Sequence, residues 1–211
     1  MKVIRFRSHS SEAFTLIEVT VVVVVMGILM SMGVSAFRNS KGQGLSPANY
    51  ACGQLFQRAR EVALATMKPT RVYISDENAT ERRGRFLTIA TGERLEAEDN
   101  LSWKAYGTPV LLTDGIFFDA DASLRESTGK GPWRALVDLQ IGKRSGAGDW
   151  YYYEFTETGT SRNAGARFVI AAGRLPDTGN RIQTSQDEHR AGFLIQRAGR
   201  LSYIKDPKQI L

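Results

Sequence analysis

A single carboxylate, that of Glu18, lies near the start of a long apolar segment. From residue 13 the segment reads AFTLIEVTVVVVVMGILMSMGVSAF, and the next charged residue after Glu18 is Arg38. As a helix rising about 1.5 Å per residue, residues 14–37 would extend about 36 Å, enough to cross a hydrocarbon core of roughly 30 Å. A carboxylate at mid-membrane costs about 2.5–3.5 kcal/mol. Because an unpaired charge is costly in a low dielectric, we expect Glu18 to pair with a cation.

Three kinds of N-terminal segment fit this pattern. A plain membrane anchor accounts for the apolar length, and the basic residues Lys2, Arg5 and Arg7 predict a cytoplasmic N-terminus. A cleaved secretory signal accounts for the small residues at 34–36, although its apolar core would be unusually long. Neither of these two segments explains an acidic residue at position 18.

The third kind is suggested by AFTLIEV, which resembles the type III signal of type IV pilins and type II secretion pseudopilins. The resemblance implies that a prepilin peptidase cleaves between Ala13 and Phe14 and N-methylates Phe14. It also implies that Glu18 pairs with the N-terminal amine of a neighbouring subunit during assembly, which supplies the missing cation. The chain departs from the family pattern at Ala13, where glycine is usual, and at Ser35, where proline is common.

Residues 38–47 (RNSKGQGLSP) predict a flexible break, and an amphipathic helix follows at 48–67. Ser46 is the predicted N-cap and Pro47 the first helical residue. We expect the helix to end before Pro69. Its apolar residues recur on one face, with charged residues on the other. The residues of the apolar face are Ala48, Cys52, Leu55, Ala59, Val62 and Ala63.

The remainder of the chain predicts an antiparallel β-sheet. Short runs rich in β-branched and aromatic residues alternate with turns rich in glycine, aspartate and asparagine. The helix would lay its apolar face on this sheet, which makes the predicted fold class α+β. The predicted strands are residues 70–75, 84–90, 101–106, 115–120, 134–141, 150–156, 167–172, 192–196 and 200–205.

A long N-terminal helix whose second half packs on an antiparallel sheet is the plan of the pilin-like fold. Three stretches resemble the GspH/FimT-type minor pseudopilins: LFQRAREVALATMKPTRVYI, YEFTETGTSRNAG and RAGRLSYIK. Residues 92–148 resemble no part of that family. The implied organisation is a leader peptide at 1–13, a transmembrane and filament-core helix at 14–37, and a periplasmic globular domain at 48–211.

Composition narrows the possible chemistry. The chain has 211 residues, one cysteine, two histidines and a formal net charge of +6. A single cysteine excludes an internal disulfide and a zinc site built on cysteine pairs. No Walker A or GxSxG motif occurs. His189 lies in a polar stretch, and the acidic residues of 93–100 lack EF-hand spacing. We therefore expect no metal, no cofactor and no catalysis.

The mild positive charge also fits an anionic partner. Some FimT-type minor pilins bind DNA through a Gly-Arg-x-Arg turn near the C-terminus. Gly199 and Arg200 match that pattern, while Ser202 stands at the second arginine position. The resemblance makes DNA binding an alternative function, with nearby basic residues able to contact phosphates. These nearby residues are Arg190, Arg197 and Lys205.

Taken together, the sequence predicts a structural subunit of a type IV pilus or type II secretion pseudopilus. It would be a single-pass protein of the bacterial inner membrane, with its N-terminus in the cytoplasm and its globular domain in the periplasm. Expected partners are the prepilin peptidase/methyltransferase, other pilin or pseudopilin subunits that contact the N-terminal helix, and the inner membrane. The alternatives are a DNA-binding minor pilin and a plain membrane-anchored periplasmic protein.

Overall fold

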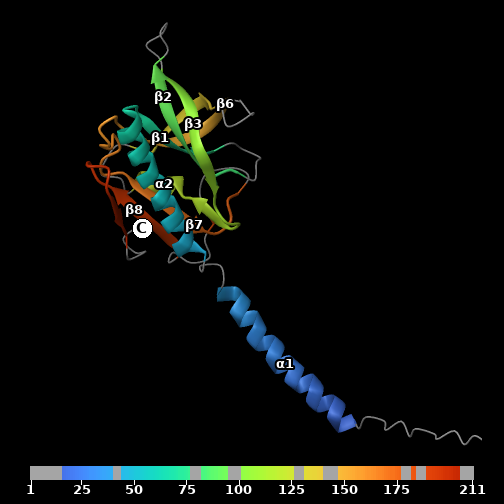
Figure 1. The fold of residues 1–211 in the computed structure, drawn as a ribbon. Helices are drawn as coiled ribbons and strands as arrows, with labels where there is room; N and C mark the ends of the chain where they lie inside the picture. The colour runs from blue at the N-terminus through green and yellow to red at the C-terminus, as the bar shows by residue number, and fades with distance from the viewer. Residues whose placement is uncertain are drawn as a thin grey trace, which may run out of the picture. The chain divides into compact units, whose positions relative to one another are not determined.

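The computed structural model describes residues 16–39, 44–76, 82–94, 101–125, 131–139, 147–176, 182–183 and 189–204. The chain divides into two compact units, Met1–Ser40 and Lys41–Leu211. The first unit contains helix α1, and the second contains the other helices and all the strands that are described (Figure 1). The second unit is an α+β domain with its own hydrophobic core.

Helix α1, Leu16–Asn39, covers most of the helix predicted at 14–37. Its side chains are described over residues 16–27, where all but Glu18, Thr20 and Gly27 are apolar. The Thr20 hydroxyl donates to the carbonyl oxygen of Leu16 at 2.8 Å, so this polar group is satisfied within the helix. Among the described residues, no helix combines the length and the apolar character needed to span a membrane. The membrane span therefore stays a prediction.

Helix α2, Leu45–Thr66, is amphipathic, and every residue of its predicted apolar face is buried. The first helical residue is Leu45 and the N-cap is Gly44. The Gly44 carbonyl accepts the first helical hydrogen bond, from the amide of Ala48 at 3.1 Å. The predicted Ser46 cap is therefore wrong. Pro47 falls within the first turn, where a missing N–H removes no helical bond. Met67 ends the helix in the left-handed conformation, with φ of 53°.

The described strands form two sheets rather than the single sheet predicted. The larger has the order β3-β2-β1-β6-β5 and the smaller has the order β4-β7-β8-β9. All of these pairings are antiparallel, as predicted. The chain crosses between the sheets after β3, β4 and β6. The alternation of apolar and polar residues within a strand does not show to which sheet the strand belongs. The bounds are β1 Thr70–Ser75, β2 Phe86–Arg94, β3 Leu101–Leu111, β4 Ile116–Phe118, β5 Trp133–Asp138, β6 Ala147–Phe155, β7 Arg167–Ala172, β8 Arg190–Ile195 and β9 Leu201–Tyr203.

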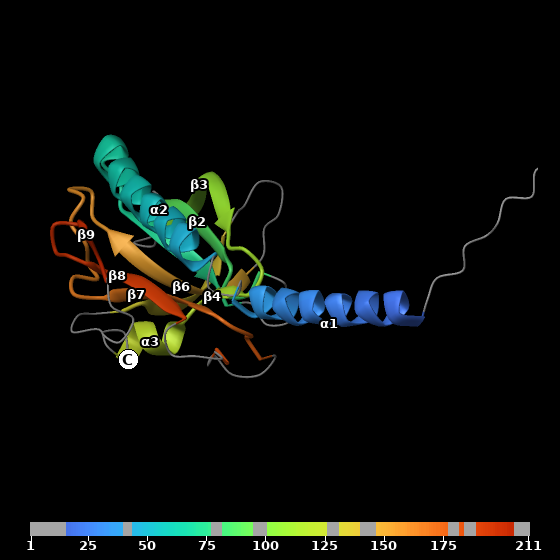
Figure 2. The same ribbon diagram turned by 90° about the horizontal axis from the view of Figure 1, so that it is seen from below.

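The main core lies between α2 and the inner faces of both sheets. Figure 2 shows α2 lying over strands of the two sheets. Phe56 is at the centre, fully buried, with four aromatic rings at centroid distances of 5.0 to 6.4 Å. Edge-to-face pairs at such distances add to the area that each ring buries. The four rings are those of Tyr153, Phe155, Phe168 and Phe193.

Helix α3, Ala120–Arg125, was not predicted. Asp119 caps it, because a carboxylate oxygen accepts a hydrogen bond from the Ala122 amide at 3.0 Å. Ala122 packs on Val169, so α3 covers the outer face of the smaller sheet. The region 92–148, which resembles no family pattern, thus supplies β3, β4, α3 and β5.

Candidate functional site

The residues predicted to direct processing and assembly are at the N-terminus. Ala13 and Phe14 lie outside the described residues, so the cleavage site stays a prediction. Glu18 lies in the first turn of α1 and is exposed. The partial positive charge of a helix N-terminus favours a carboxylate at this position. Among the described side chains of α1, that of Glu18 is the one ionisable group.

Over residues 16–27, apolar side chains lie on every side of α1. The five valines at 21–25 are each between 48% and 62% exposed. Successive helical residues are about 100° apart, so five in a row cover the whole circumference. An all-round apolar helix is normally buried, in a membrane or among other helices. A membrane or filament environment for α1 stays a prediction.

The second unit contains two tight turns with the same backbone geometry. They are residues 156–160 (TETGT), after β6, and residues 196–200 (QRAGR), after β8. In each turn, the amide of the first residue donates to the carbonyl of the fifth residue, at 2.9 Å in 156–160 and 2.8 Å in 196–200. The amide of the fourth residue donates to the carbonyl of the first residue, at 2.8 Å and 2.9 Å respectively. The fourth residues, Gly159 and Gly199, have φ of 70° and 72°. Glycine adopts this conformation without the steric cost that a side chain imposes.

These paired turns, 156–160 and 196–200, pack against each other and against α2. The amide of Ser161 donates to the carbonyl of Arg197 at 3.0 Å. A Cβ on Gly199 would come within 2.3 Å of the Gly159 carbonyl oxygen, so the contact requires glycine. Arg60 of α2 donates from Nε to the same Gly159 oxygen at 3.1 Å. Two of the stretches that resemble minor pseudopilins are thus in direct contact.

The second of the paired turns presents positive charge. Arg197 and Arg200 are both exposed, and Gly199 between them is buried. Within the described residues, neither arginine forms an ion pair. The structure therefore brings three of the candidate DNA-binding residues together on one turn.

The other residues considered for DNA binding are placed differently. Ser202 accepts a hydrogen bond from Gln196 Nε2 at 2.6 Å and adds no charge. Arg190 donates to Asp119 at 3.2 Å in a largely buried ion pair, away from the paired turns. Lys205 lies outside the described residues. Among the described residues of the turn 196–200, the positive charge comes from Arg197 and Arg200.

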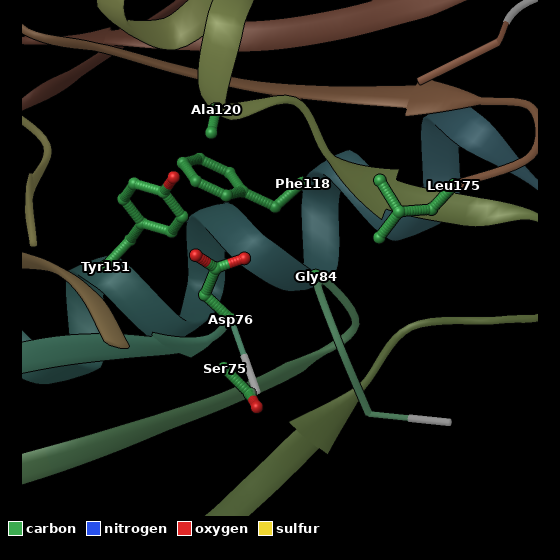
Figure 3. A pocket seen from close by; sticks show the side chains of 7 residues that line it. All are labelled: Ser75, Asp76, Gly84, Phe118, Ala120, Tyr151 and Leu175. Carbon is green, nitrogen blue, oxygen red and sulfur yellow. The ribbon is translucent and has the colours of Figure 1, made fainter. Parts of the chain in front are cut away.

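A small cavity lies between the end of β1 and strand β4. Its volume is about 10 Å³, room for one water molecule and too little for an organic ligand. Figure 3 shows the Asp76 carboxylate directed toward the rings of Tyr151 and Phe118. The cavity is lined by Ser75, Asp76, Gly84, Phe118, Ala120, Tyr151 and Leu175.

Asp76 is held by two arginines from different segments. It pairs with Arg83 at 3.4 Å and with Arg134 at 3.0 Å. Burial is the largest influence on the pKa of the Asp76 carboxyl, and this pKa lies above its ordinary value although the two arginines lower it. The group has the surroundings of a structural ion pair rather than of a general base in an open cleft.

The outer face of the larger sheet carries a stack that the sequence pattern did not reveal. The guanidinium of Arg71 lies 3.8 Å from the ring centroid of Trp103 and 4.0 Å from that of Tyr152. Its Nε donates to Glu154 at 2.7 Å, and Arg162 also pairs with Glu154, at 3.1 Å. Rings cover both faces of the guanidinium, so the stack ties β1, β3 and β6 together rather than offering a ligand site. Its members are far apart in sequence, and no local pattern links them.

No cluster of three or more His, Cys, Asp or Glu side chains that could hold a metal occurs in the described ranges. Cys52 is buried in α2, and burial raises the pKa of its thiol to about 12. At neutral pH this thiol is protonated and a poor nucleophile.

Comparisons with known proteins show structural similarities. No family model matches the chain, and no curated protein matches its sequence. The chain is similar to the type IV minor pilin FimU of Pseudomonas aeruginosa, with 12% identity, 80% of this chain and 98% of that chain covered, and a TM-score of 0.41. It is also similar to the minor pseudopilin EpsH of the type II secretion system of Vibrio cholerae, with 14% identity and a TM-score of 0.44. That match covers 78% of this chain and 96% of the EpsH chain.

These matched structures are minor pilins and minor pseudopilins. Their identities and TM-scores are low, so these similarities assign neither a role nor a site residue to this chain.

Proposed function

We propose that the protein is a minor pilin or pseudopilin, a structural subunit that is cleaved before Phe14 and assembled into a type IV pilus or type II secretion pseudopilus. The observation that carries the proposal is Glu18 in the first turn of α1, a helix with apolar side chains exposed on every side. Such a helix is suited to lipid before assembly and to neighbouring helices afterwards. The transfer changes little in hydrophobic energy, because lipid tails and apolar side chains are alike.

The role proposed for Glu18 is to set the position of each new subunit. Cleavage would create an amine at Phe14, four residues before Glu18. The carboxylate of one subunit and the amine of the next would each be costly alone in an apolar environment and would stabilise each other when paired. The basic flank before the apolar segment supports a cytoplasmic N-terminus and a periplasmic second unit.

The direct test is the intact mass and N-terminal sequence of the protein from native membranes. The expected result is a chain that begins with N-methyl-Phe14. A chain that still begins with Met1 would indicate a plain anchor, and cleavage near residue 37 would indicate a secretory signal. Either of these results would contradict the proposal.

A second test separates processing from assembly. Glu18→Gln preserves the shape of the side chain and removes its charge. We expect this variant to be cleaved normally but lost from sheared filaments, with the wild type and Glu157→Gln, an exposed site in the second unit, as controls. Normal incorporation of Glu18→Gln would show that the charge is not needed for assembly.

A second candidate function is DNA binding, favoured by exposed Arg197 and Arg200 on one rigid turn. The test is the affinity of the wild-type chain for duplex DNA at several salt concentrations. If both arginines contact phosphates, replacing them with alanine weakens binding and lowers the salt slope by about two. The absence of measurable wild-type affinity would exclude this function.

A further inference from the structure

Strand β3 is an open edge of the larger sheet. It is the last strand in the order β3-β2-β1-β6-β5, and among the described strands it pairs with β2 alone. An edge strand has a row of backbone N–H and C=O groups that face away from its one partner. These groups form a template on which another strand can pair.

The β3 edge is the longest and most regular of the sheet edges described. It has 11 residues, compared with 6 in β5 and 3 each in β4 and β9. Its register with β2 is unbroken from Leu101 to Tyr106. The irregular part lies at the other end, where Gly107 has φ of 75°. Residues 101–106 therefore present an unbroken ladder of backbone groups.

The outer end of the β2–β3 hairpin extends beyond the rest of the sheet. The pairing of β1 with β2 ends at Thr70 and Thr91, whereas β2 and β3 stay paired as far as Arg94 and Leu101. Figure 1 shows these two strands reaching past β1. A two-stranded ribbon is marginally stable by itself, so this extension needs support.

That support comes from two contacts at the base of the extension. Lys68 pairs with Glu93 at 2.9 Å. Trp103 lies over Gly92, where a Cβ would come within 3.2 Å of the indole, and it stacks on Arg71. The edge is thus fixed in an extended form before any partner binds, which lowers the entropy cost of binding.

The charge on the edge selects the kind of strand that fits. Lys104 is the one charged residue within 101–111, and it is exposed. Antiparallel pairing of two copies centred on Trp103 or Lys104 would put both lysines on the same face, opposite or diagonal to each other. Like charges at such positions are destabilising. A strand with an acidic residue facing Lys104 is favoured over a second copy of this chain.

We propose that residues 101–106 of β3 form a docking site for an extended strand of a different polypeptide, a neighbouring filament subunit with an acidic residue facing Lys104. Backbone hydrogen bonds would extend the larger sheet by one strand, and the Lys104 contact would select the partner. That the partner is a filament subunit rests on the proposed function.

The test is site-specific photo-crosslinking in cells with the full-length chain. A photoreactive residue replaces Ser102 or Tyr106 on β3, or Leu136 on β5, a side chain that is 73% exposed at the opposite edge. We expect one different polypeptide to be crosslinked several-fold more at the β3 positions, through a peptide that contains Asp or Glu. Adding Lys104→Glu should abolish most of that product. No crosslink, equal crosslinking at Leu136, or crosslinking to a second copy would overturn the proposal.

A backbone variant supports the same test. Neighbouring residues of a strand direct their N–H groups to opposite sides, so proline at 104 and proline at 105 have different effects. One should break the pairing with β2 and destabilise the fold, and the other should leave the fold intact and remove the crosslink. If the variant that stays folded kept the crosslink, strand pairing would be excluded.

The N-terminal sequence of the crosslinked sample distinguishes the two proposals. A chain cleaved at Phe14 without a β3 crosslink would overturn the docking site and leave the proposed function standing. An uncleaved chain with a β3 crosslink would overturn the proposed function and leave a strand-docking edge.

Discussion

At the scale of single residues, Glu154 illustrates how a charge is held inside this protein. Its side chain is 3% exposed and pairs with Arg71 at 2.7 Å and with Arg162 at 3.1 Å. Its amide donates to the side-chain oxygen of Asn163 at 2.7 Å. These contacts connect the outer face of the larger sheet with residues 162–163, which follow the first of the paired turns.

Glu154→Ala should be strongly destabilising, because it leaves the buried side of Arg71 without a counter-charge. Removing one partner of a buried ion pair costs about 3–5 kcal/mol of unfolding free energy. Denaturant titration of Glu154→Ala and of a control variant measures the loss of unfolding free energy. Glu157→Ala, three residues along and exposed, is the matched control and should unfold like the wild type. Equal losses in both variants would show that the Glu154 pairs contribute nothing.

Gly199 and Gly115 provide a second comparison of single residues. Both have positive φ, 72° and 79°. Alanine in this conformation costs about 1–2 kcal/mol at either site. At Gly199 the new Cβ would also meet the Gly159 oxygen at 2.3 Å, whereas at Gly115 the nearest atom is 3.9 Å away. Thermal unfolding should therefore show a larger loss for Gly199→Ala, and equal losses would show that the paired turns can separate without cost.

At the scale of elements, α2 depends on its buried face. The sequence pattern located this face correctly, since periodicity along a helix reports burial directly. The pattern did not identify Ser46 as a residue inside the helix, because Gly44 can cap with its backbone alone. The sequence pattern did not predict helix α3 for a different reason. Its cap, Asp119, also pairs with Arg190 of β8, and a contact between residues so far apart in sequence leaves no local pattern.

Phe56→Ala tests the packing between α2 and the two sheets. Phe56 is fully buried among four rings, so its truncation should cost about 3–5 kcal/mol of unfolding free energy. Tyr50→Ala, on the same helix but 62% exposed, should change stability by less than about 0.5 kcal/mol. Denaturant titration compares the two. A small effect at Phe56 would mean that the core collapses readily around the missing ring.

At the scale of the whole second unit, the notable feature is the join between the two sheets. Asp76 follows β1 of the larger sheet, and Phe118 of β4 lines the same small cavity. Arg83 and Arg134 approach Asp76 from two further segments. Local unfolding here would separate the sheets, so the ionisation of Asp76 should influence the stability of the entire unit.

Asp76 gives a pH dependence with a defined sign. Burial raises its pKa above the ordinary value of 3.8, so the folded chain binds the proton more tightly than the unfolded chain does. This contribution to stability is complete at low pH and is lost as pH rises through the folded pKa. Asp76→Asn lacks the titration, so between about pH 4 and pH 7 its unfolding free energy should fall less than that of the wild type.

Glu93 is the control of opposite sign. The Lys68 hydrogen bond lowers the pKa of the Glu93 carboxyl, so its stabilising contribution is present at neutral pH and is lost as pH falls. Glu93→Gln should therefore differ from the wild type most at neutral pH and least in acid. Denaturant titration across pH checks both variants, and the same pH trend in both would contradict the assignment at Asp76.

The amino-acid sequence by itself determined the features that depend on neighbours along the chain. These are the single carboxylate of Glu18 in an apolar segment, the buried face of α2, and the existence and antiparallel pairing of the strands. Only the tertiary structure decided the division into two sheets, the contact between the paired turns, the stack on Arg71 and the open edge at β3. Periodicity states whether a side chain is buried, but many strand orders satisfy the same periodicity. Packing between segments that are distant in sequence selects one of those orders.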